Sequence, residues 1–507
     1  MSEKGRVALI FGAVAVVLGG GLFYFFKIHQ PKQQQAAAQT EVVAWEQRWD
    51  EARTCLFGKQ PISSRAGESL AVREMQPDPW ERKTCTKLIG KLSRGVADDT
   101  GLMKIEHAWM TIDRAASKVA NAFATHVDPF GEAVESRGKE SPLPAALEEL
   151  DAAHADLRKA AGMDPPAIAQ LPSLPAAELL VLKDGTAPVT SLDSWVLPSA
   201  GGLFFHGSTK GGSVQIVHAP GQAPKVLKVP GGALRAVPDL AWGATGLYSE
   251  VAIAPIDDRG AFGTITSLAV PEGARVYGAV GSFAAGLVAY GAGVQLTIAR
   301  SAGGPFTADK PVEMERSAVA IDPAGRLLVA WNDLTKEDDR AIAAQLRGFI
   351  SKGDGAPKIV DLGTGYAGSA CLTATQGWVG DSTQVTSFDD TAAVPHVLPQ
   401  HELLGCTRDT ALLHKLASSH YVACKATCRI VDLTALKSTH VATVAGDKVQ
   451  AIRARGKVIG VWREAAAPVF YATDVEVTPM MATSDGKVID ILATTTEGVV
   501  LARVPVR

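Results

Sequence analysis

The feature that most constrains this fold is a unit of β-type sequence that recurs through most of the chain. From about Leu179 onward, an apolar strand is followed by a turn containing glycine or a small polar residue. A second strand then opens with two or three hydrophobic residues. The eight second-strand openings are GGLFFHG (from Gly201), TGLYSEV (Thr245), AGLVAYG (Ala285), GRLLVAW (Gly325), QGWVGDS (Gln376), SHYVACK (Ser419), GKVIGVW (Gly456) and EGVVLAR (Glu497). They lie about 37 to 51 residues apart, the interval of a four-stranded β-propeller blade.

The alternative to a propeller is a pair of β-sandwich domains, but a sandwich has no reason to repeat one unit at near-constant spacing. We therefore predict a β-propeller of seven or eight blades over residues 179–507. The last repeat is short, because only two strands remain at the C-terminus. A propeller must close its ring, and AELLVLKDG (Ala177–Gly185) can supply an outer strand to a shared closing blade.

Residues 41–162 have a helical pattern instead. Val42, Trp45 and Trp49 recur at spacings of three and four, and Gly58 is a stop signal. Later segments of this region have the same periodicity, so we expect about four antiparallel helices. The tryptophans could form a ligand-binding cluster, but core packing is the commoner role for them. They are Trp45, Trp49, Trp80 and Trp109. Residues 163–178 carry four prolines and predict a linker, so the predicted fold class is α + β with several domains.

The N-terminus contains an apolar stretch. Residues 7–26 are uncharged and of sufficient length to cross a bilayer as a helix. The stretch ends in bulky aromatic residues, whereas a signal peptidase site requires small ones. We therefore predict a short tail (1–6), an uncleaved transmembrane anchor (7–26) and a polar spacer (27–40). The protein would be a single-pass membrane protein with the bulk of the chain in the periplasm or an equivalent extracytoplasmic space.

The chain has six cysteines, an even number, which suits an oxidising compartment; six unrelated thiols in a cytosolic protein are the alternative. Cys55 lies near the end of the first expected helix and Cys85 near the start of the second. Antiparallel packing would bring them together, and a disulfide there would stabilise the fold by about 3–4 kcal/mol.

The stretch HKLASSHYVACKATCRIVDL looks most like a ligand site. It carries His414, His420, Cys424 and Cys428, which could bind zinc if all four side chains converged. In the propeller register, however, Cys424 and Cys428 face each other across a hairpin and can form a disulfide. Cys371 and Cys406 could then pair by elimination, although four cysteines allow three connectivities.

Two segments resemble a known family. VAIDPAGRLLVAWNDL (Val319–Leu334) and LTIARSAGGPFTADKPV (Leu296–Val312) resemble the repeats of sialidase-like propellers of the Asp-box (BNR) type. In the second segment a strand ending in Ser301 precedes a turn with Gly304 and then Phe306; the usual aspartate of that motif is missing. The resemblance implies the propeller architecture. It also implies an arginine cluster and a Tyr/Glu nucleophile pair for sialidase-like enzymes, positions that we do not assign in this chain.

Other candidate chemistry is sparse. Paired aspartates occur in IDDRG (256–260), KEDDR (336–340) and FDDTA (388–392), and could act in acid/base catalysis or bind Ca²⁺, but exposed loop charges are the simpler interpretation. The sequence has neither a Gly-x-Ser-x-Gly elbow nor a phosphate-binding Gly-x4-Gly-Lys-Ser/Thr loop. We assign no catalytic, cofactor-binding or metal residues. A formal charge of −3 without basic runs argues against a nucleic-acid partner.

These patterns favour a binding or scaffold role over catalysis. The expected function is a membrane-anchored propeller in the cell envelope, inserted through residues 7–26, that binds a protein or glycan on its propeller face. One alternative is a glycosidase- or lyase-like enzyme acting at the propeller funnel. Another is a structural subunit of a membrane complex that docks through the helical domain.

Overall fold

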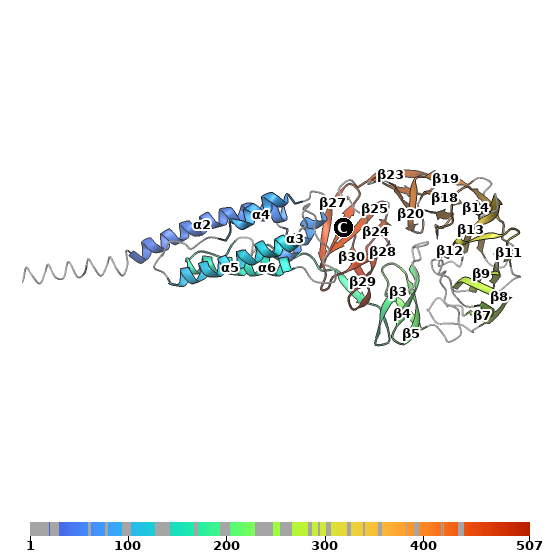
Figure 1. The fold of residues 1–507 in the computed structure, drawn as a ribbon, viewed down its shortest axis with the longest axis horizontal. Coiled ribbons are helices and arrows are strands. Elements are labelled where there is room, and N and C mark those ends of the chain that lie inside the picture. The colour runs from blue at the N-terminus through green and yellow to red at the C-terminus, as the bar shows by residue number, and fades with distance from the viewer. Residues whose placement is uncertain are drawn as a thin grey trace, which may run out of the picture. The chain divides into compact units, whose positions relative to one another are not determined.

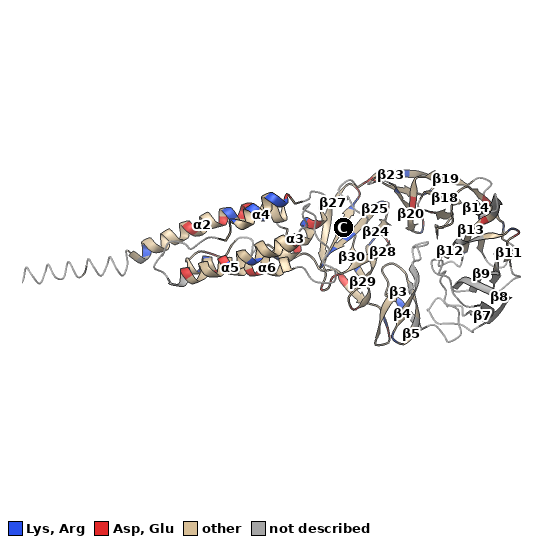
Figure 2. Cartoon of the chain, in the orientation of Figure 1, with Lys and Arg blue, Asp and Glu red and all other residues tan. Residues whose placement is uncertain are grey.

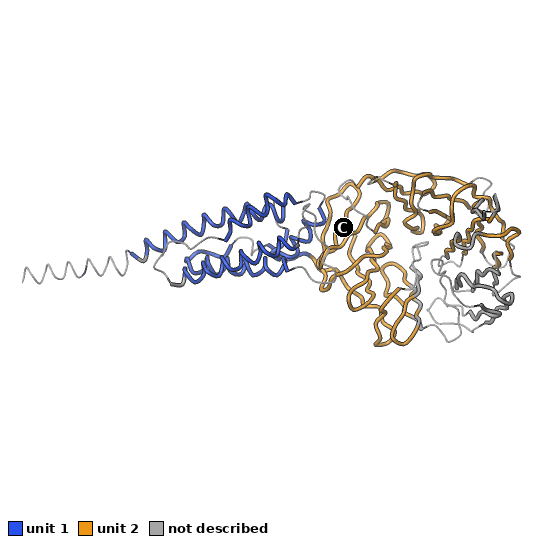
Figure 3. The backbone as a smooth tube through the Cα atoms, viewed as in Figure 1, with its two compact units in different colours: residues 1–174 blue, residues 175–507 orange. Residues whose placement is uncertain are grey.

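The chain divides into two compact units, residues 1–174 and residues 175–507, and the division lies within the predicted proline-rich linker (Figure 3). The computed structural model describes residues 20, 30–58, 62–76, 80–93, 103–126, 142–166, 171–192, 203–228, 247–253, 266–281, 286–292, 295–300, 306–321, 326–337, 340–352, 357–381, 383–389, 395–416, 418, 420–433 and 441–506.

The first unit is helical. Its described helices are α2 (Gln30–Phe57), α3 (Ala66–Met75), α4 (Arg82–Gly90), α5 (Met103–His126) and α6 (Pro142–Ala160). Two differences from the expectation follow. Residues 30–40, part of the predicted spacer, belong to helix α2, and α3 was not predicted. Helix α3 is short, and its hydrophobic residues lie among Ser69, Arg73 and Glu74, so the sequence shows little helical periodicity there.

Hydrophobic side chains at helical spacing form one core in this unit. The tryptophans at positions 45, 49, 80 and 109 are at most 6% exposed and pack with residues of α4, α5 and α6. Two indole groups also make hydrogen bonds: Trp45 Nε1 donates to the Leu92 carbonyl oxygen at 3.2 Å and Trp80 Nε1 to that of Leu56 at 3.0 Å. In Figure 2, acidic and basic residues are interspersed along the helices.

The predicted transmembrane helix requires a correction. No helix among the described residues is long and apolar enough to cross a membrane. The longest of them, α2 with 28 residues and α5 with 24, carry charged side chains along their length. The predicted fold class and the single-pass membrane localisation are corrected accordingly. The predicted anchor, residues 7–26, lies outside the described residues apart from Gly20.

The described strands of the second unit form seven small antiparallel sheets, none of which closes on itself. The first sheet has strands β2 (Lys183–Asp184), β3 (Ala187–Leu192), β4 (Leu203–Thr209), β5 (Gly212–His218) and β6 (Lys225–Lys228). The second has β7 (Leu247–Ile253), β8 (Thr266–Gly281), β9 (Gly286–Ala292), β10 (Gln295–Arg300) and β11 (Phe306–Thr307). The third has β12 (Val312–Ile321), β13 (Arg326–Glu337), β14 (Arg340–Lys352) and β15 (Val360–Gly363).

The remaining sheets have four strands each. The fourth has β16 (Ser369–Leu372), β17 (Gly377–Gly380), β18 (Gln384–Phe388) and β19 (His396–Pro399). The fifth has β20 (His401–Cys406), β21 (Ala411–Lys415), β22 (His420–Cys424) and β23 (Cys428–Asp432). The sixth has β24 (Val441–Ala445), β25 (Lys448–Arg455), β26 (Val458–Arg463) and β27 (Ala466–Ala472). The seventh has β28 (Thr478–Ser484), β29 (Val488–Thr495), β30 (Gly498–Pro505) and β1 (Glu178–Val181).

The sheets are arranged as propeller blades. In six of them the strands lie side by side in chain order, and in the seventh β1 lies beyond β30. The leading strands β12, β16, β20, β24 and β28 contact one another in succession (Figure 1). Strand β1 completes the seventh sheet by pairing with β30, with Glu178 opposite Arg503, which confirms the predicted closing strand.

The described strands form seven sheets, whereas the sequence has eight second-strand openings. The openings at Thr245 and Ala285 fall in or beside β7 and β9, two strands of the same sheet. Those at Ser419, Gly456 and Glu497 precede β22, β26 and β30, which are third rather than second strands of their sheets. Both middle strands of a blade are covered on each face by neighbouring sheets, as in β17 and β26, so both read as hydrophobic runs and the sequence does not distinguish them.

Hydrophobic cores lie between successive sheets. One joins the third and fourth through residues such as Leu328 and Val379, and another joins the fourth and fifth through Trp378 and Leu413. The seventh sheet packs on the first through Leu501 and Val189 among others. The sheets of this unit are therefore held face to face by apolar packing.

Candidate functional site

The histidine- and cysteine-containing stretch folds as the outer hairpin of the fifth sheet. Strands β22 and β23 pair in a register that places Cys424 directly opposite Cys428. The two cysteines form a disulfide with a Cα–Cα distance of 4.0 Å across a sequence separation of 4. Cys424 is fully buried, whereas Cys428 is exposed.

The two histidines of this stretch have other partners. His420 Nε2 lies 3.4 Å from Asp432 Oδ2, which is its cross-strand neighbour. His414 Nε2 lies 2.8 Å from the Ser418 carbonyl oxygen, within the turn between β21 and β22. No group of three or more potential metal ligands occurs in the described parts of the chain. Because the sulfurs are joined to each other, the structure does not bring the four proposed zinc ligands together.

The prediction of disulfide bonds is confirmed, and each of the other two joins separate elements. Cys55 of α2 pairs with Cys85 of α4 at a Cα–Cα distance of 5.6 Å. Cys371 of β16 pairs with Cys406 of β20 at 5.7 Å, so this bond connects the fourth sheet to the fifth.

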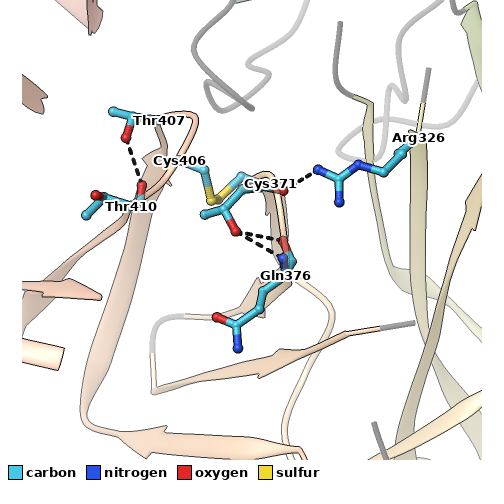
Figure 4. Close-up of a disulfide and its surroundings, with 7 residues drawn as sticks. Arg326, Cys371, Gln376, Cys406, Thr407 and Thr410 are labelled. Carbon is cyan, nitrogen blue, oxygen red and sulfur yellow. Dashed lines mark hydrogen bonds between the residues drawn. A yellow bond between two sulfur atoms is a disulfide. The ribbon is translucent and has the colours of Figure 1, made fainter. Parts of the chain in front are cut away.

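The surroundings of Cys371–Cys406 show how three sheets meet (Figure 4). The Arg326 guanidinium, from the start of β13, donates a hydrogen bond to the Thr373 carbonyl oxygen just beyond β16. Two tight turns flank the disulfide. In one, Thr373 Oγ1 accepts from Gln376 N at 3.0 Å, and in the other Thr407 N donates to the Thr410 carbonyl oxygen at 2.8 Å. Together these contacts connect the third, fourth and fifth sheets.

Ion pairs connect the fifth sheet to the sixth. Arg429 of β23 pairs with Glu464, and Lys425 Nζ lies 2.6 Å from Asp447 Oδ1 in the turn between β24 and β25. A hydrogen bond from Lys425 lowers the pKa of the Asp447 carboxyl group below its usual value. Because these side chains are solvated, the pairs orient the hairpin more than they stabilise it.

A buried charged cluster connects the seventh sheet to the first. Asp490 of β29 accepts hydrogen bonds from His218 Nε2 at 2.9 Å, Gly221 N at 2.7 Å and Arg503 Nε at 2.7 Å. The side chains of His218 and Asp490 are 0% exposed. Burial alone would raise the pKa of Asp490, but the hydrogen bonds from His218, Arg503 and Gly221 outweigh burial and lower it. Arg503 also faces Glu178 of the closing strand at 3.8 Å.

The helical unit has its own polar cluster between α2 and α6. Glu46 pairs with both His154 and Arg158. Burial raises the pKa of Glu46, but hydrogen bonds from Arg158 and His154 exceed that effect and leave it lowered. Burial lowers the pKa of His154. Nearby, burial raises the pKa of Asp151 to about 6, despite the opposing charge of Arg53.

Several predicted features lie outside the described residues. They are the aspartate pairs at 257–258 and 338–339, Asp390 of the third pair, and Ser301 and Gly304 of the sialidase-like turn. Phe306 from that turn packs against Trp331 and Phe349, with ring centroids 6.0 Å and 5.3 Å away, and so serves the hydrophobic core.

Sequence reasoning missed the Asp490 cluster. Asp490 and His218 are 272 residues apart, and neither belongs to a local motif. The one available signal was a charged residue within the apolar strand VIDILATT, because a carboxylate in a buried strand requires partners.

Comparisons with known proteins show likeness at the level of fold. Neither a protein-family model nor a curated protein matches the chain. Among solved structures, apo AztD from Citrobacter koseri is similar to 57% of this chain over 87% of its own, with 12% identity and a TM-score of 0.37. The β-propeller domain of Cps50 (Swd1) from Myceliophteria thermophila matches 65% of this chain over 100% of its own, with 11% identity and a TM-score of 0.33. The CNH domain of AfRom2 matches 64% over 98%, with 10% identity and a TM-score of 0.31. Nothing in these comparisons supports the sialidase-like resemblance beyond a propeller-type fold.

Proposed function

We propose that this protein is a non-catalytic binding or scaffold module whose propeller-like unit is a rigid platform for a protein partner. One observation carries the proposal: side-chain cross-links connect successive sheets. Arg326 reaches the fourth sheet, Cys371–Cys406 connects the fourth to the fifth, and Arg429–Glu464 connects the fifth to the sixth. Asp490 connects the seventh sheet to the first.

Cross-linking of this kind suits recognition better than a movable active site. A surface that is already ordered loses little conformational freedom on binding, so more of the contact free energy appears as affinity. The chemically capable side chains in these junctions also have structural partners. His218 and Arg503 both contact Asp490, and His420 contacts Asp432.

Exposed apolar side chains on outer strands are the proposed contact points. Ile430 of β23 is 67% exposed and Val397 of β19 is 41% exposed. Hydrophobic residues displayed on a rigid edge suit a protein partner better than a glycan, which requires polar contacts and aromatic rings. In the helical unit, Met110 at 61% exposure is a second candidate contact for a docking role.

Photo-crosslinking tests the proposal. A benzophenone amino acid is placed at Ile430, Val397 or Met110, with exposed Lys457 as a control position. The expected result is one discrete protein adduct from an apolar position and none from Lys457. The captured protein is then purified and titrated against the wild type, Ile430→Asp and Lys457→Asp by calorimetry.

We expect roughly tenfold weaker binding for Ile430→Asp, which corresponds to about 1.4 kcal/mol, and unchanged binding for Lys457→Asp. Equal effects of the two substitutions would count against the proposed contact. Turnover of a glycoside panel by the purified chain would establish the enzymatic alternative instead.

A further inference from the structure

The Cys424–Cys428 disulfide differs from the other two in exposure. All six cysteines are described: Cys428 is exposed to solvent, Cys55 is partly buried and the other four are buried. Cys371 and Cys406 are 0% and 2% exposed, and Cys85 is 0% exposed. A thiol in solution therefore reaches Cys428 more readily than any cysteine of the other two bonds, of which only Cys55 is partly exposed.

This disulfide also has the smallest structural role. It closes a loop with a sequence separation of 4, against 30 for Cys55–Cys85 and 35 for Cys371–Cys406. The stabilisation expected from a disulfide grows with the length of the loop it closes. Four further residue pairs join β22 to β23, from His420–Asp432 to Ala423–Arg429, so the hairpin register does not depend on the sulfur bond.

We propose that Cys424–Cys428 is a thiol–disulfide exchange site that opens and closes without unfolding the propeller. An exposed disulfide whose loss leaves the fold intact has the properties of a labile, exchanging bond rather than a structural one. The reactant is a small thiol, and access directs its attack to the Cys428 sulfur.

The exchange balances in two steps. An incoming thiolate forms a bond to Cys428 Sγ, and the bond to Cys424 Sγ breaks. Cys424 leaves as a thiolate and takes a proton from water. A second thiolate then attacks the sulfur of the bound thiol and releases a small-molecule disulfide and the Cys428 thiolate, for a net two-electron reduction of the protein. Because β22 and β23 hold the two sulfurs opposite each other, Cys424 can also reverse the first step.

Native-state reduction tests the site. The folded full-length chain is incubated with millimolar reduced glutathione, quenched with iodoacetamide over time and digested for non-reducing mass spectrometry. We expect the Cys424–Cys428 bond to open at least roughly tenfold faster than the other two, with the glutathione adduct on Cys428. Circular dichroism and tryptophan fluorescence should remain unchanged during that phase.

Two single variants supply a matched control for access. In Cys424→Ser the exposed Cys428 thiol remains, and in Cys428→Ser the buried Cys424 thiol remains. We expect iodoacetamide to label the first at least roughly tenfold faster than the second. The proposal is overturned if the three disulfides open together, if Cys424–Cys428 opens last, if its opening unfolds the propeller, or if the two variants are labelled at equal rates.

Discussion

The substitution Asp490→Asn should destabilise the propeller-like unit. Asp490 accepts the hydrogen bonds of the buried charged cluster that connects the seventh sheet to the first. Its carboxylate accepts from His218 Nε2, Gly221 N and two nitrogens of Arg503. Asparagine has the same shape but no charge. Its NH₂ group is a donor and cannot accept a hydrogen bond from the His218, Gly221 or Arg503 donors. Arg503, 16% exposed, would retain the Gln222 carbonyl oxygen at 2.6 Å and Glu178 at 3.8 Å.

The burial of the ion pair sets the expected loss in the free energy of unfolding. Removing one partner of a buried, hydrogen-bonded ion pair typically costs 3–5 kcal/mol, and the partial exposure of Arg503 favours the lower end, about 3 kcal/mol. For a unit spanning residues 175–507 this corresponds to a fall in Tm of about 4 °C. Calorimetry and far-UV circular dichroism would measure the fall.

The pH dependence provides a sharper test. The pKa of Asp490 is lowered in the folded protein, so its contribution is fully present above the ordinary carboxyl pKa of about 4. That contribution is lost as the pH falls through the lowered value. The stability difference between the wild type and Asp490→Asn should therefore shrink between about pH 4 and the acid limit of folding.

A matched control is Asp447→Asn, which removes the solvent-exposed partner of Lys425. Its effect on Tm should lie within experimental error, because a solvated pair contributes little. Two results would contradict the role given to the buried Asp490 cluster. One is an equal change of Tm for Asp490→Asn and Asp447→Asn. The other is a stability difference between wild type and Asp490→Asn that is the same at pH 7 and pH 3.

Three further predictions concern stability. Asp151→Asn should stabilise the helical unit by about 1–2 kcal/mol at pH 7, because the carboxyl pKa is raised to about 6 in the fold and ionisation is penalised there; the gain should vanish near pH 4 in urea titrations. Replacing Cys55 and Cys85 together with serine should cost about 3–4 kcal/mol, measured as an early helical transition, and a loss below about 1 kcal/mol would contradict the loop-closure estimate. Gly498 has φ of +141°, and a Cβ there would lie 2.4 Å from the Val189 carbonyl oxygen, so Gly498→Ala should cost about 2 kcal/mol or more in chemical denaturation.

Local patterns predicted the parts of the fold that depend on near neighbours. The spacing of Trp45 and Trp49 predicted a helix, and α2 contains both. Strand alternation around Cys424 and Cys428 predicted their opposition, which the hairpin register shows. The membrane anchor illustrates the opposite case: an apolar run suggested it, but no helix among the described residues is long and apolar enough to cross a membrane.

The site was less predictable than the fold. His414 and His420 looked like ligands because of their spacing to cysteines, but spacing does not specify where a side chain points. Asp490 did not look like part of a site, because its partner His218 belongs to the opposite end of the propeller sequence.

By itself, the sequence determined the two classes of secondary structure, the recurrence of blade-like units and the closing strand. Each of these depends on hydrophobic periodicity or on proline and glycine placement, which act over a few residues. Only the tertiary structure decided the grouping of strands into seven described sheets, the presence of helix α3, and the buried charged cluster around Asp490. These depend on which segments pack across long sequence distances, and a carboxylate in a strand acquires its role only when such packing removes it from water.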